Sequence, residues 1–163
     1  MEKHEKEYIK KMKYIAGLCE CCFNIPFELI IAQSALESTW GESDKAKKLN
    51  NYFGMKKKHG DLSEYENCLT PEERAGIINI EYHEFRKYKN MKESVYDYCM
   101  RIRFNKYYTD VYKLLKKYCE TENKYILEQA INELGKIYAS DSKYGSKIID
   151  IIERNDLRKY MWL

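Results

Sequence analysis

One carboxylate stands near the end of an otherwise apolar helical stretch. Residues 29–36 are almost all apolar, which predicts a helix buried on most of its sides. We expect this helix to begin with Asn24 as N-cap and Pro26 in its first turn, and to end before Gly41. Glu37 then lies in the last turn, near the negative end of the helix dipole, where burial raises the pKa of a carboxyl group. A carboxylic acid that stays protonated near neutral pH is the general acid that a glycosidase needs.

The same helix allows a second interpretation. A glutamate beside a helix end commonly reaches solvent, and perturbed carboxyl groups also occur in structural ion pairs. Judged from this helix alone, that outcome is the more common one for Glu37, so the rest of the chain has to decide.

Basic residues gather around the segment that follows this helix. They are Lys45, Lys47, Lys48, Lys56, Lys57, Lys58 and His59. Such a patch predicts an anionic partner, for which a cell-wall polymer, a nucleic acid and a membrane surface are candidates, while a solvated loop is the alternative. The whole chain has a net charge of only +3, so the patch is a local feature. The 16 tyrosines suit a sugar-binding groove, but they suit helix surfaces as well.

Length and composition indicate one folded domain. A chain of 163 residues with 44% hydrophobic residues can bury a core. The spacing of Cys19 and Cys22 resembles half of a zinc knuckle, but no second knuckle or histidine pair completes it, so we expect free thiols. No stretch approaches the roughly 20 apolar residues of a membrane span. The mixed-charge N-terminus shows no signal peptide.

Apolar residues recur at helical spacing along most of the chain. The spacing predicts helices at 5–22, 93–104, 106–120, 123–137 and 145–155, and one turn at 43–49. Pro71 and Gly76 break regular helix before residue 77, and residues 77–85 alternate as a strand does. The fold class expected is mainly α, with a small two- or three-stranded β lobe at about 62–85. No linker or repeat divides the chain, so we expect residues 1–163 to form a single domain.

Four stretches carry motifs that occur together in a known family. Residues 32–41, Ala-Gln-Ser-Ala-Leu-Glu-Ser-Thr-Trp-Gly, are similar to A-Q-A-A-L-E-S-G-W-G, and residues 50–56, Asn-Asn-Tyr-Phe-Gly-Met-Lys, are similar to N-N-L-F-G-I-K. Residues 85–98 follow F-R-x-Y…E-S…D-Y, and residues 138–144 follow Y-A-T-D-P-x-Y. In this order, over about residues 25–155, they resemble the family-73 glycoside hydrolases. These are the peptidoglycan N-acetylglucosaminidases of autolysins, flagellar rod hydrolases and phage lysins.

The resemblance implies a lysozyme-like α bundle whose small β lobe flanks a glycan-binding groove. It makes Glu37 the general acid that protonates the glycosidic oxygen between N-acetylglucosamine and N-acetylmuramic acid. It also implies a second catalytic carboxylate in the β lobe. Counting back from Phe85 with Gly76 held in register gives Glu72, while departures from the family pattern beside it keep Glu73 as a rival.

The second and fourth motifs supply further candidates. The hydroxyl of Tyr138 could bind the substrate's acetamido group or support the general acid, so we count it with the catalytic residues. The candidate substrate-binding residues are Tyr144, Asn51, Phe53 and Asp141. Packing around the groove is the main expectation for Phe53 and Tyr144, and bracing of its own loop is the main expectation for Asp141.

The resemblance thus implies a monomeric peptidoglycan hydrolase that binds glycan strands without a cofactor or metal and binds no nucleic acid. A muramidase or lytic transglycosylase on the same fold and a non-catalytic wall-binding assembly module are the alternatives. The Gly-Leu-Met-Gln segment usual after the glutamate of transglycosylases is absent. The mechanism stays open between inverting, retaining and substrate-assisted. We expect the chain to act on the bacterial cell wall, either released from the cytoplasm as phage lysins are or as an excised domain of a secreted protein.

Overall fold

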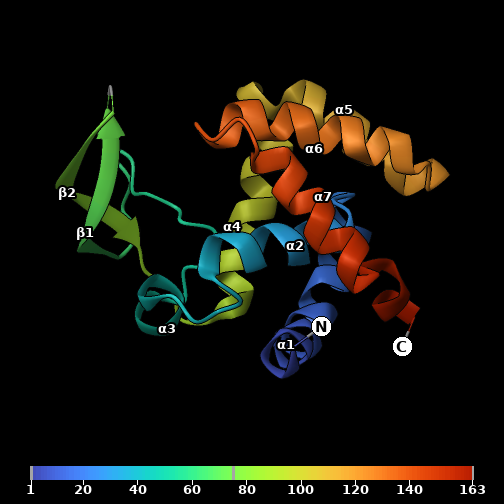
Figure 1. Ribbon diagram of the computed structural model, residues 1–163, viewed down its shortest axis with the longest axis horizontal. Helices are drawn as coiled ribbons and strands as arrows, with labels where there is room; N and C mark the ends of the chain where they lie inside the picture. Colours follow the sequence, from blue (N-terminus) through green and yellow to red (C-terminus); the bar gives the residue numbers. More distant parts are fainter. Residues whose placement is uncertain (1, 75, 163) are drawn as a thin grey trace.

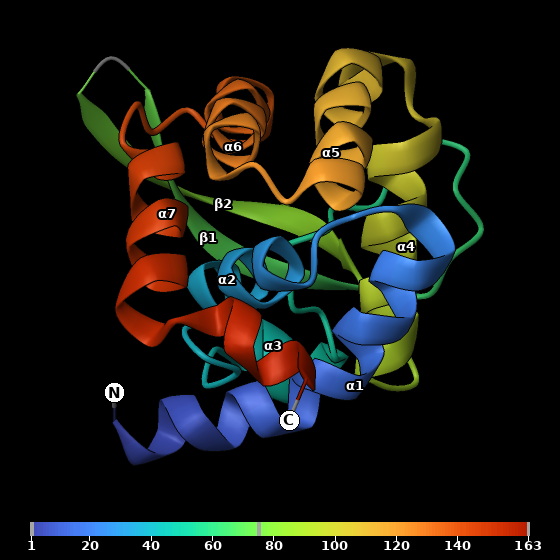
Figure 2. The same cartoon turned by 90° about the vertical axis from the view of Figure 1, so that its right-hand side faces the viewer.

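The helix that carries Glu37 lies at the centre of the molecule. The structure is a computed structural model that describes residues 2–74 and 76–162, with the backbone alone for residues 72–74 and 162. Helix α2 (Phe27–Ser38) is buried at every position from Phe27 to Ala35, as its apolar run predicts. Figure 2 shows the other helices packed around it on several sides. A helix held in this way presents its last turn in a fixed place.

The start of α2 differs from the sequence prediction. Asn24 does not cap α2, because it ends helix α1 (Lys3–Phe23) in the left-handed conformation, with a φ of 54°. Asparagine tolerates that conformation better than most residues. Pro26 takes the N-cap position of α2, and the carboxylate of Glu20 accepts a hydrogen bond of 2.6 Å from the backbone N–H of Phe27. A side chain of α1 therefore satisfies a free N–H of α2.

The predicted helices are present, with ends that differ by a few residues. The helices that follow α2 are α3 (Asp44–Leu49), α4 (Met91–Phe104), α5 (Thr109–Thr121), α6 (Lys124–Tyr138) and α7 (Tyr144–Asn155). Two 3₁₀ segments, η1 (Lys106–Tyr108) and η2 (Leu157–Trp162), precede α5 and follow α7. The sequence patterns did not distinguish η1 from α5 and did not predict η2. Among the described residues, no helix is both long and apolar enough to cross a membrane.

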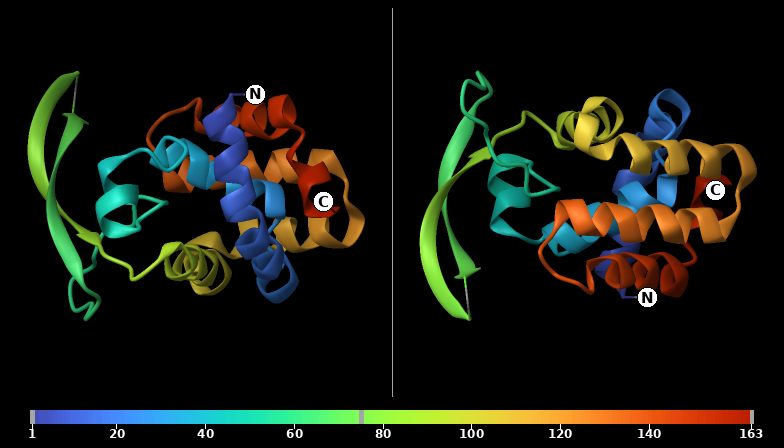
Figure 3. Two further views of the ribbon diagram at one scale, coloured as in Figure 1. Left: turned by 90° about the horizontal axis from the view of Figure 1, so that it is seen from below. Right: turned by 90° about the horizontal axis from the view of Figure 1, so that it is seen from above.

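The β lobe is an antiparallel hairpin of β1 (Tyr65–Arg74) and β2 (Ile77–Arg86). Tyr65 pairs with Arg86 at its base, and Pro71 pairs with Ile80, where an edge strand tolerates the missing N–H. The mainly α fold with a β lobe near 62–85 is thus confirmed. Figures 1 and 3 show the hairpin curving alongside the helical body, apart from it over most of its length.

Polar contacts at the base of the hairpin fix it to the helical body. The guanidinium of Arg86 donates two hydrogen bonds of 2.8 and 2.7 Å to Asp97 on α4, and it forms an ion pair of 2.5 Å with Asp61. The hydroxyl of Tyr88 also donates to Asp97. The ring of Phe85 is 2% exposed and lies under the ammonium of Lys45, which is 4.2 Å from the ring centroid. The base of the hairpin is therefore anchored to the body.

Candidate active site

Glu37 lies in the last turn of α2, at the end of the helix. The helix stops there because Thr39 and Trp40 adopt left-handed conformations, with φ of 51° and 56°, and Gly41 follows with a φ of 81°. The hydroxyl of Ser38 accepts a hydrogen bond of 2.8 Å from the backbone N–H of Gly41 and closes the turn. Burial raises the pKa of the Glu37 carboxyl group, and this outweighs the hydrogen bond from Tyr144 and the charge of Lys45, which both lower it.

A chain of buried hydrogen bonds holds the Glu37 carboxylate from one side. The hydroxyl of Tyr98 donates to Oε1 of Gln33, which fixes the orientation of that amide. Nε2 of Gln33 then donates to the hydroxyl oxygen of Tyr144 at 3.0 Å. The hydroxyl of Tyr144 donates its single proton to Oε1 of Glu37, at 2.5 Å. Since Oε1 already accepts this bond, a proton on Glu37 belongs on Oε2.

The second oxygen of Glu37 faces the backbone of the loop between α3 and the hairpin. A Cβ built on Gly54 would lie 3.5 Å from Oε2 of Glu37, and Gly54 has a φ of 62°. The absence of a side chain at Gly54 leaves Oε2 open on this side. The hydroxyl of Tyr138 donates to the backbone carbonyl of Phe53 at 2.7 Å and so holds this loop beside the carboxylate.

Two of the candidate substrate-binding residues are interior. Asn51 and Phe53 are each 1% exposed. The side-chain amide of Asn51 donates to the carbonyls of Met55 and Arg86 and accepts a hydrogen bond from the N–H of Met55. The ring of Phe53 stacks on Tyr98 with centroids 4.0 Å apart. Phe53 therefore packs, as was mainly expected of it, whereas the expected role of Asn51 changes from substrate contact to support of the loop.

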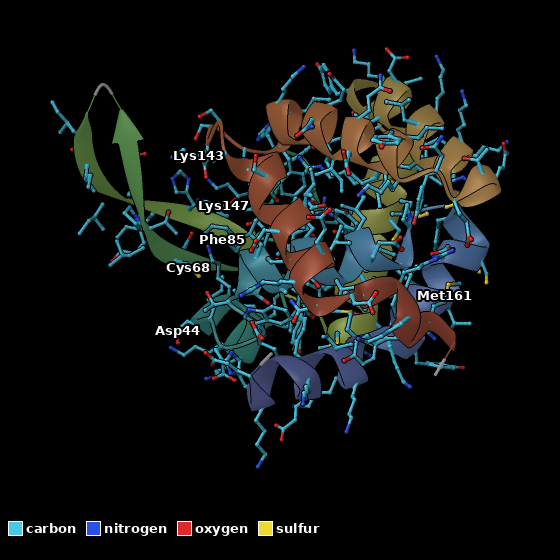
Figure 4. The ribbon with its side chains drawn as sticks, turned by 45° about the vertical axis from the view of Figure 1, so that its right-hand side comes forward. Asp44, Cys68, Phe85, Lys143, Lys147 and Met161 are labelled. Atoms are coloured by element: carbon cyan, nitrogen blue, oxygen red, sulfur yellow. The ribbon has the colours of Figure 1, made fainter. Side chains whose placement is uncertain are left out.

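The residues of the fourth motif separate into two roles. Tyr144 is 5% exposed and touches Glu37, so it does more than the packing expected of it. Tyr138 contacts the loop carbonyl rather than Glu37, and its ring stacks on Tyr144 at 5.9 Å. Asp141 is exposed, accepts a bond of 2.9 Å from the N–H of Lys143 and pairs with Lys147 at 2.7 Å, which matches the bracing expected of it. Figure 4 shows Lys143 and Lys147 where α7 begins, on the side toward the hairpin.

The second predicted carboxylate lies on β1 near the far end of the hairpin. Glu72 and Glu73 pair with Asn79 and Ile78 through their backbones. Their side chains lie outside the described part of the structure.

The lysines near the site do not form one unpaired patch. Lys47 pairs with Glu42, and Lys48 pairs with Asp44 at 3.1 Å. The ammonium of Lys45 lies over the ring of Phe85, and its charge lowers the pKa of Glu37. The six cysteines are all free thiols. Among the described residues, no group of three or more His, Cys, Asp or Glu side chains is arranged to hold a metal ion.

Sequence reasoning did not find Gln33 and Asp97 as parts of the site. Gln33 is fully buried between two tyrosine hydroxyls, and Asp97 accepts bonds from both Arg86 and Tyr88. For Gln33, the available signal was a polar residue at a position that the helical pattern places in the core. A buried polar group must find a partner, and such partners commonly serve a site.

A family model and several curated proteins match most of this chain. A family model described as Glucosaminidase, mannosyl-glycoprotein endo-beta-N-acetylglucosaminidase, matches residues 18–157. Among curated proteins, the exo-glucosaminidase LytG of Bacillus subtilis is 33% identical over 133 residues, which are 81% of this chain and 45% of that protein. The peptidoglycan hydrolase FlgJ of Escherichia coli is 26% identical over 153 residues, which are 91% of this chain and 46% of that protein. The chain spans somewhat less than half the length of these curated relatives.

Solved structures agree with the family match. The catalytic domain of the autolysin Auto from Listeria monocytogenes has a TM-score of 0.81 at 25% identity, covering 98% of this chain and 89% of that one. The N-acetylmuramoyl-L-alanine amidase structure from Staphylococcus aureus has a TM-score of 0.78 at 29% identity, covering 99% and 44%. The fold and its site define a glycoside hydrolase domain, a helical body of lysozyme-like form with a β hairpin beside it. More narrowly, the chain belongs to the glucosaminidase family, the family-73 glycoside hydrolases.

Proposed function

We propose that this domain hydrolyses the β-1,4 bond between N-acetylglucosamine and N-acetylmuramic acid within the glycan strands of bacterial peptidoglycan, with Glu37 as general acid. The observation that carries the proposal is the state of Glu37. Its pKa is raised by burial, one of its oxygens is held by Tyr144, and the other faces the open side of Gly54. A protonated, oriented carboxyl group is what a glycosidic leaving group requires.

In the proposed reaction, the proton on Oε2 of Glu37 passes to the glycosidic oxygen as its bond to the anomeric carbon breaks. The electron pair of that bond stays with the leaving oxygen, and positive charge develops at the anomeric carbon and ring oxygen of the sugar that remains. Tyr144 then donates its hydrogen bond to a full carboxylate, which is the stronger interaction. The same carboxylate can accept a proton from the attacking water in the next step.

The proposed second carboxylate is Glu72. Counting back from Phe85 with Gly76 held in register gives this position, whose backbone pairs with Asn79 on β2. A hairpin fixed at its base could bring this position to the sugar when substrate binds. The substrate's 2-acetamido group is the alternative nucleophile.

Support for peptidoglycan as substrate comes from the names of the relatives, which include a peptidoglycan hydrolase and an autolysin. On this basis we propose that the domain acts on the bacterial cell wall, as a monomer and without a cofactor. Cleavage inside a strand accords with the endo-acting description of the family model, while one relative is named an exo-glucosaminidase.

The test is mass spectrometry of purified peptidoglycan digested by the wild type and by Glu37→Gln. The wild type should release fragments with reducing N-acetylglucosamine ends, and the variant should be slower by about 10²-fold or more while staying folded. Glu42→Gln is the matched control, because Glu42 is an exposed glutamate that pairs with Lys47 on the surface. Reducing muramic acid ends would show a muramidase, 1,6-anhydro ends a transglycosylase, and single terminal sugars an exo-acting enzyme.

A further inference from the structure

A basic cleft of about 550 Å³ lies beside the candidate active site. It is formed by the loop after Gly54, the base of the hairpin, the C-terminal half of α4 and the segment that leads into η1. Its charged lining consists of Lys56, Lys58, Arg86, Arg101 and Lys106 together with one carboxylate, Asp97. We call this the basic cleft.

The positive charge of the basic cleft exceeds what its own carboxylate can neutralise. Asp97 is engaged by Arg86, which also pairs with Asp61. Arg101 donates to the sulfur of Met55 at 3.2 Å, and among the described residues it forms no ion pair with a carboxylate. Its Nε is shielded from solvent and has no hydrogen-bond partner in that part of the chain. A guanidinium in this setting is a favourable partner for an anion.

The basic cleft begins at Met55, one residue after Gly54, and Gly54 faces the general acid Glu37. Gly54 faces Oε2 of Glu37, and the next residue, Met55, contacts Arg101. The pKa of Tyr138 is affected by the charges of both Glu37 and Arg101. Burial is the main cause that raises this pKa, Glu37 raises it further, and Arg101 lowers it. A ligand group attached to a sugar next to the scissile bond is therefore within reach of the cleft.

The basic cleft also has an apolar part. Met100 and Phe104 on α4 line it and are 47% and 64% exposed. A short acidic peptide offers both carboxylates and apolar groups such as methyls, whereas a phosphate polymer offers charge with little apolar surface. The combination in the cleft favours the peptide.

We propose that the basic cleft binds the carboxylate-bearing peptide stem on a muramic acid residue adjacent to the cleaved bond, and that Arg101 determines preference for stem-bearing glycan. The proposal rests on the proposed function, because peptidoglycan is the substrate that brings such a stem to the site. Muramic acid carries its stem on a lactyl group, so the stem leaves the strand sideways, toward the walls of a groove.

The experiment compares kcat/KM on stem-bearing glycan strands and on strands whose stems an amidase has removed. Both substrates are first freed of phosphate polymers. Arg101→Gln should lower the stem-bearing to stem-free ratio about tenfold, the usual effect of losing one charge-assisted hydrogen bond. The double variant Lys58→Gln/Lys106→Gln should lower it less, because both lysines are exposed. The matched control Lys116→Gln/Lys117→Gln removes two exposed charges from α5 and should leave the ratio unchanged.

A binding arm keeps the proposal independent of turnover. A soluble N-acetylmuramyl peptide is titrated by NMR into Glu37→Gln with and without Arg101→Gln, and into the lysine double variant in case Arg101→Gln does not fold. Weaker binding with Arg101 or the two lysines replaced supports the proposal, and equal binding and equal ratios overturn it. The kcat/KM comparison is repeated on walls that retain their phosphate polymers, and a loss seen only there also overturns the proposal, in favour of the polymer. If the wild type releases no reducing N-acetylglucosamine ends, the proposed function fails, and the titration still decides whether the cleft binds a stem.

Discussion

Replacing Tyr144 with phenylalanine removes the hydroxyl that donates to Glu37 and leaves the ring in place. The hydroxyl lies 2.5 Å from Oε1 of Glu37 and lowers the pKa of that carboxyl group, opposing the larger effect of burial. Without it, burial acts with less opposition, so the proton is held more tightly. The general acid must be protonated to work, and activity therefore falls as pH rises through the pKa of Glu37.

The expected change follows from the strength of a hydrogen bond to a charged group. Such bonds contribute about 1.5–3 kcal/mol, and about 1.4 kcal/mol corresponds to one pH unit, so the alkaline limb of kcat against pH should move up by about one pH unit or more in Tyr144→Phe. The maximum kcat should fall at the same time, because Oε1 of Glu37 is no longer held in one direction. A drop of about tenfold is reasonable for a misplaced catalytic group.

The assay is the rate of release of reducing ends from purified peptidoglycan, measured across pH for the wild type and both tyrosine variants. Tyr138→Phe makes the same chemical change on the stacked neighbour, whose hydroxyl donates to the carbonyl of Phe53 instead. That variant should lower kcat through the loop and leave the pH of the limb where it was. An alkaline limb that stays in place in Tyr144→Phe, or moves to lower pH, would refute the assignment of the hydrogen bond and of Glu37.

Three further experiments test other parts of the structure. Glu72→Gln should reduce turnover on purified peptidoglycan with substrate binding retained, and Glu73→Gln should be nearly silent; the reverse order would move the lobe carboxylate by one residue. Gly54→Ala should lower kcat about tenfold and cost about 1 kcal/mol of stability, since it places a Cβ 3.5 Å from the general acid at a φ of 62°, and a wild-type rate would show that this side of the carboxylate is not used. Arg158→Met should lower the free energy of unfolding in urea by about 3 kcal/mol, because it leaves the fully buried Glu28 without its guanidinium; an unchanged midpoint would mean that Glu28 is protonated and needs no partner.

The sequence predicted the helical elements well because their signals are local. The apolar run before Glu37 determines that α2 is buried, and the spacing of apolar residues locates α4 to α7 within a few residues. The start of α2 was harder to predict, since Asn24 suits either the end of one helix or the start of the next. Only the packing of α1 on α2, with Glu20 at the first N–H, decides between them.

Sequence reasoning missed those contacts of the site that join segments far apart in the sequence. Tyr144 reaches Glu37 across 107 positions of sequence, and Gln33 links it to Tyr98 on another helix. A motif also does not tell which of its residues touch a ligand and which support the backbone. Asn51, Phe53 and Gly54 all belong to the second motif. The side chains of Asn51 and Phe53 are buried and support the loop, whereas Gly54 lies beside the carboxylate of Glu37.

Two opposing effects on Glu37 serve different moments of the proposed reaction. Burial near the end of a helix keeps the proton on the carboxyl group until a glycosidic oxygen is present to take it. The hydroxyl of Tyr144 interacts most strongly with the carboxylate that remains afterwards, so it stabilises the charge that the proton leaves behind. Since Gln33 directs the Tyr144 proton before substrate arrives, this stabilisation needs no rearrangement as the bond breaks. Burial alone would give a weak acid that holds its proton too tightly, and the hydrogen bond alone would give an ionised group with nothing to donate.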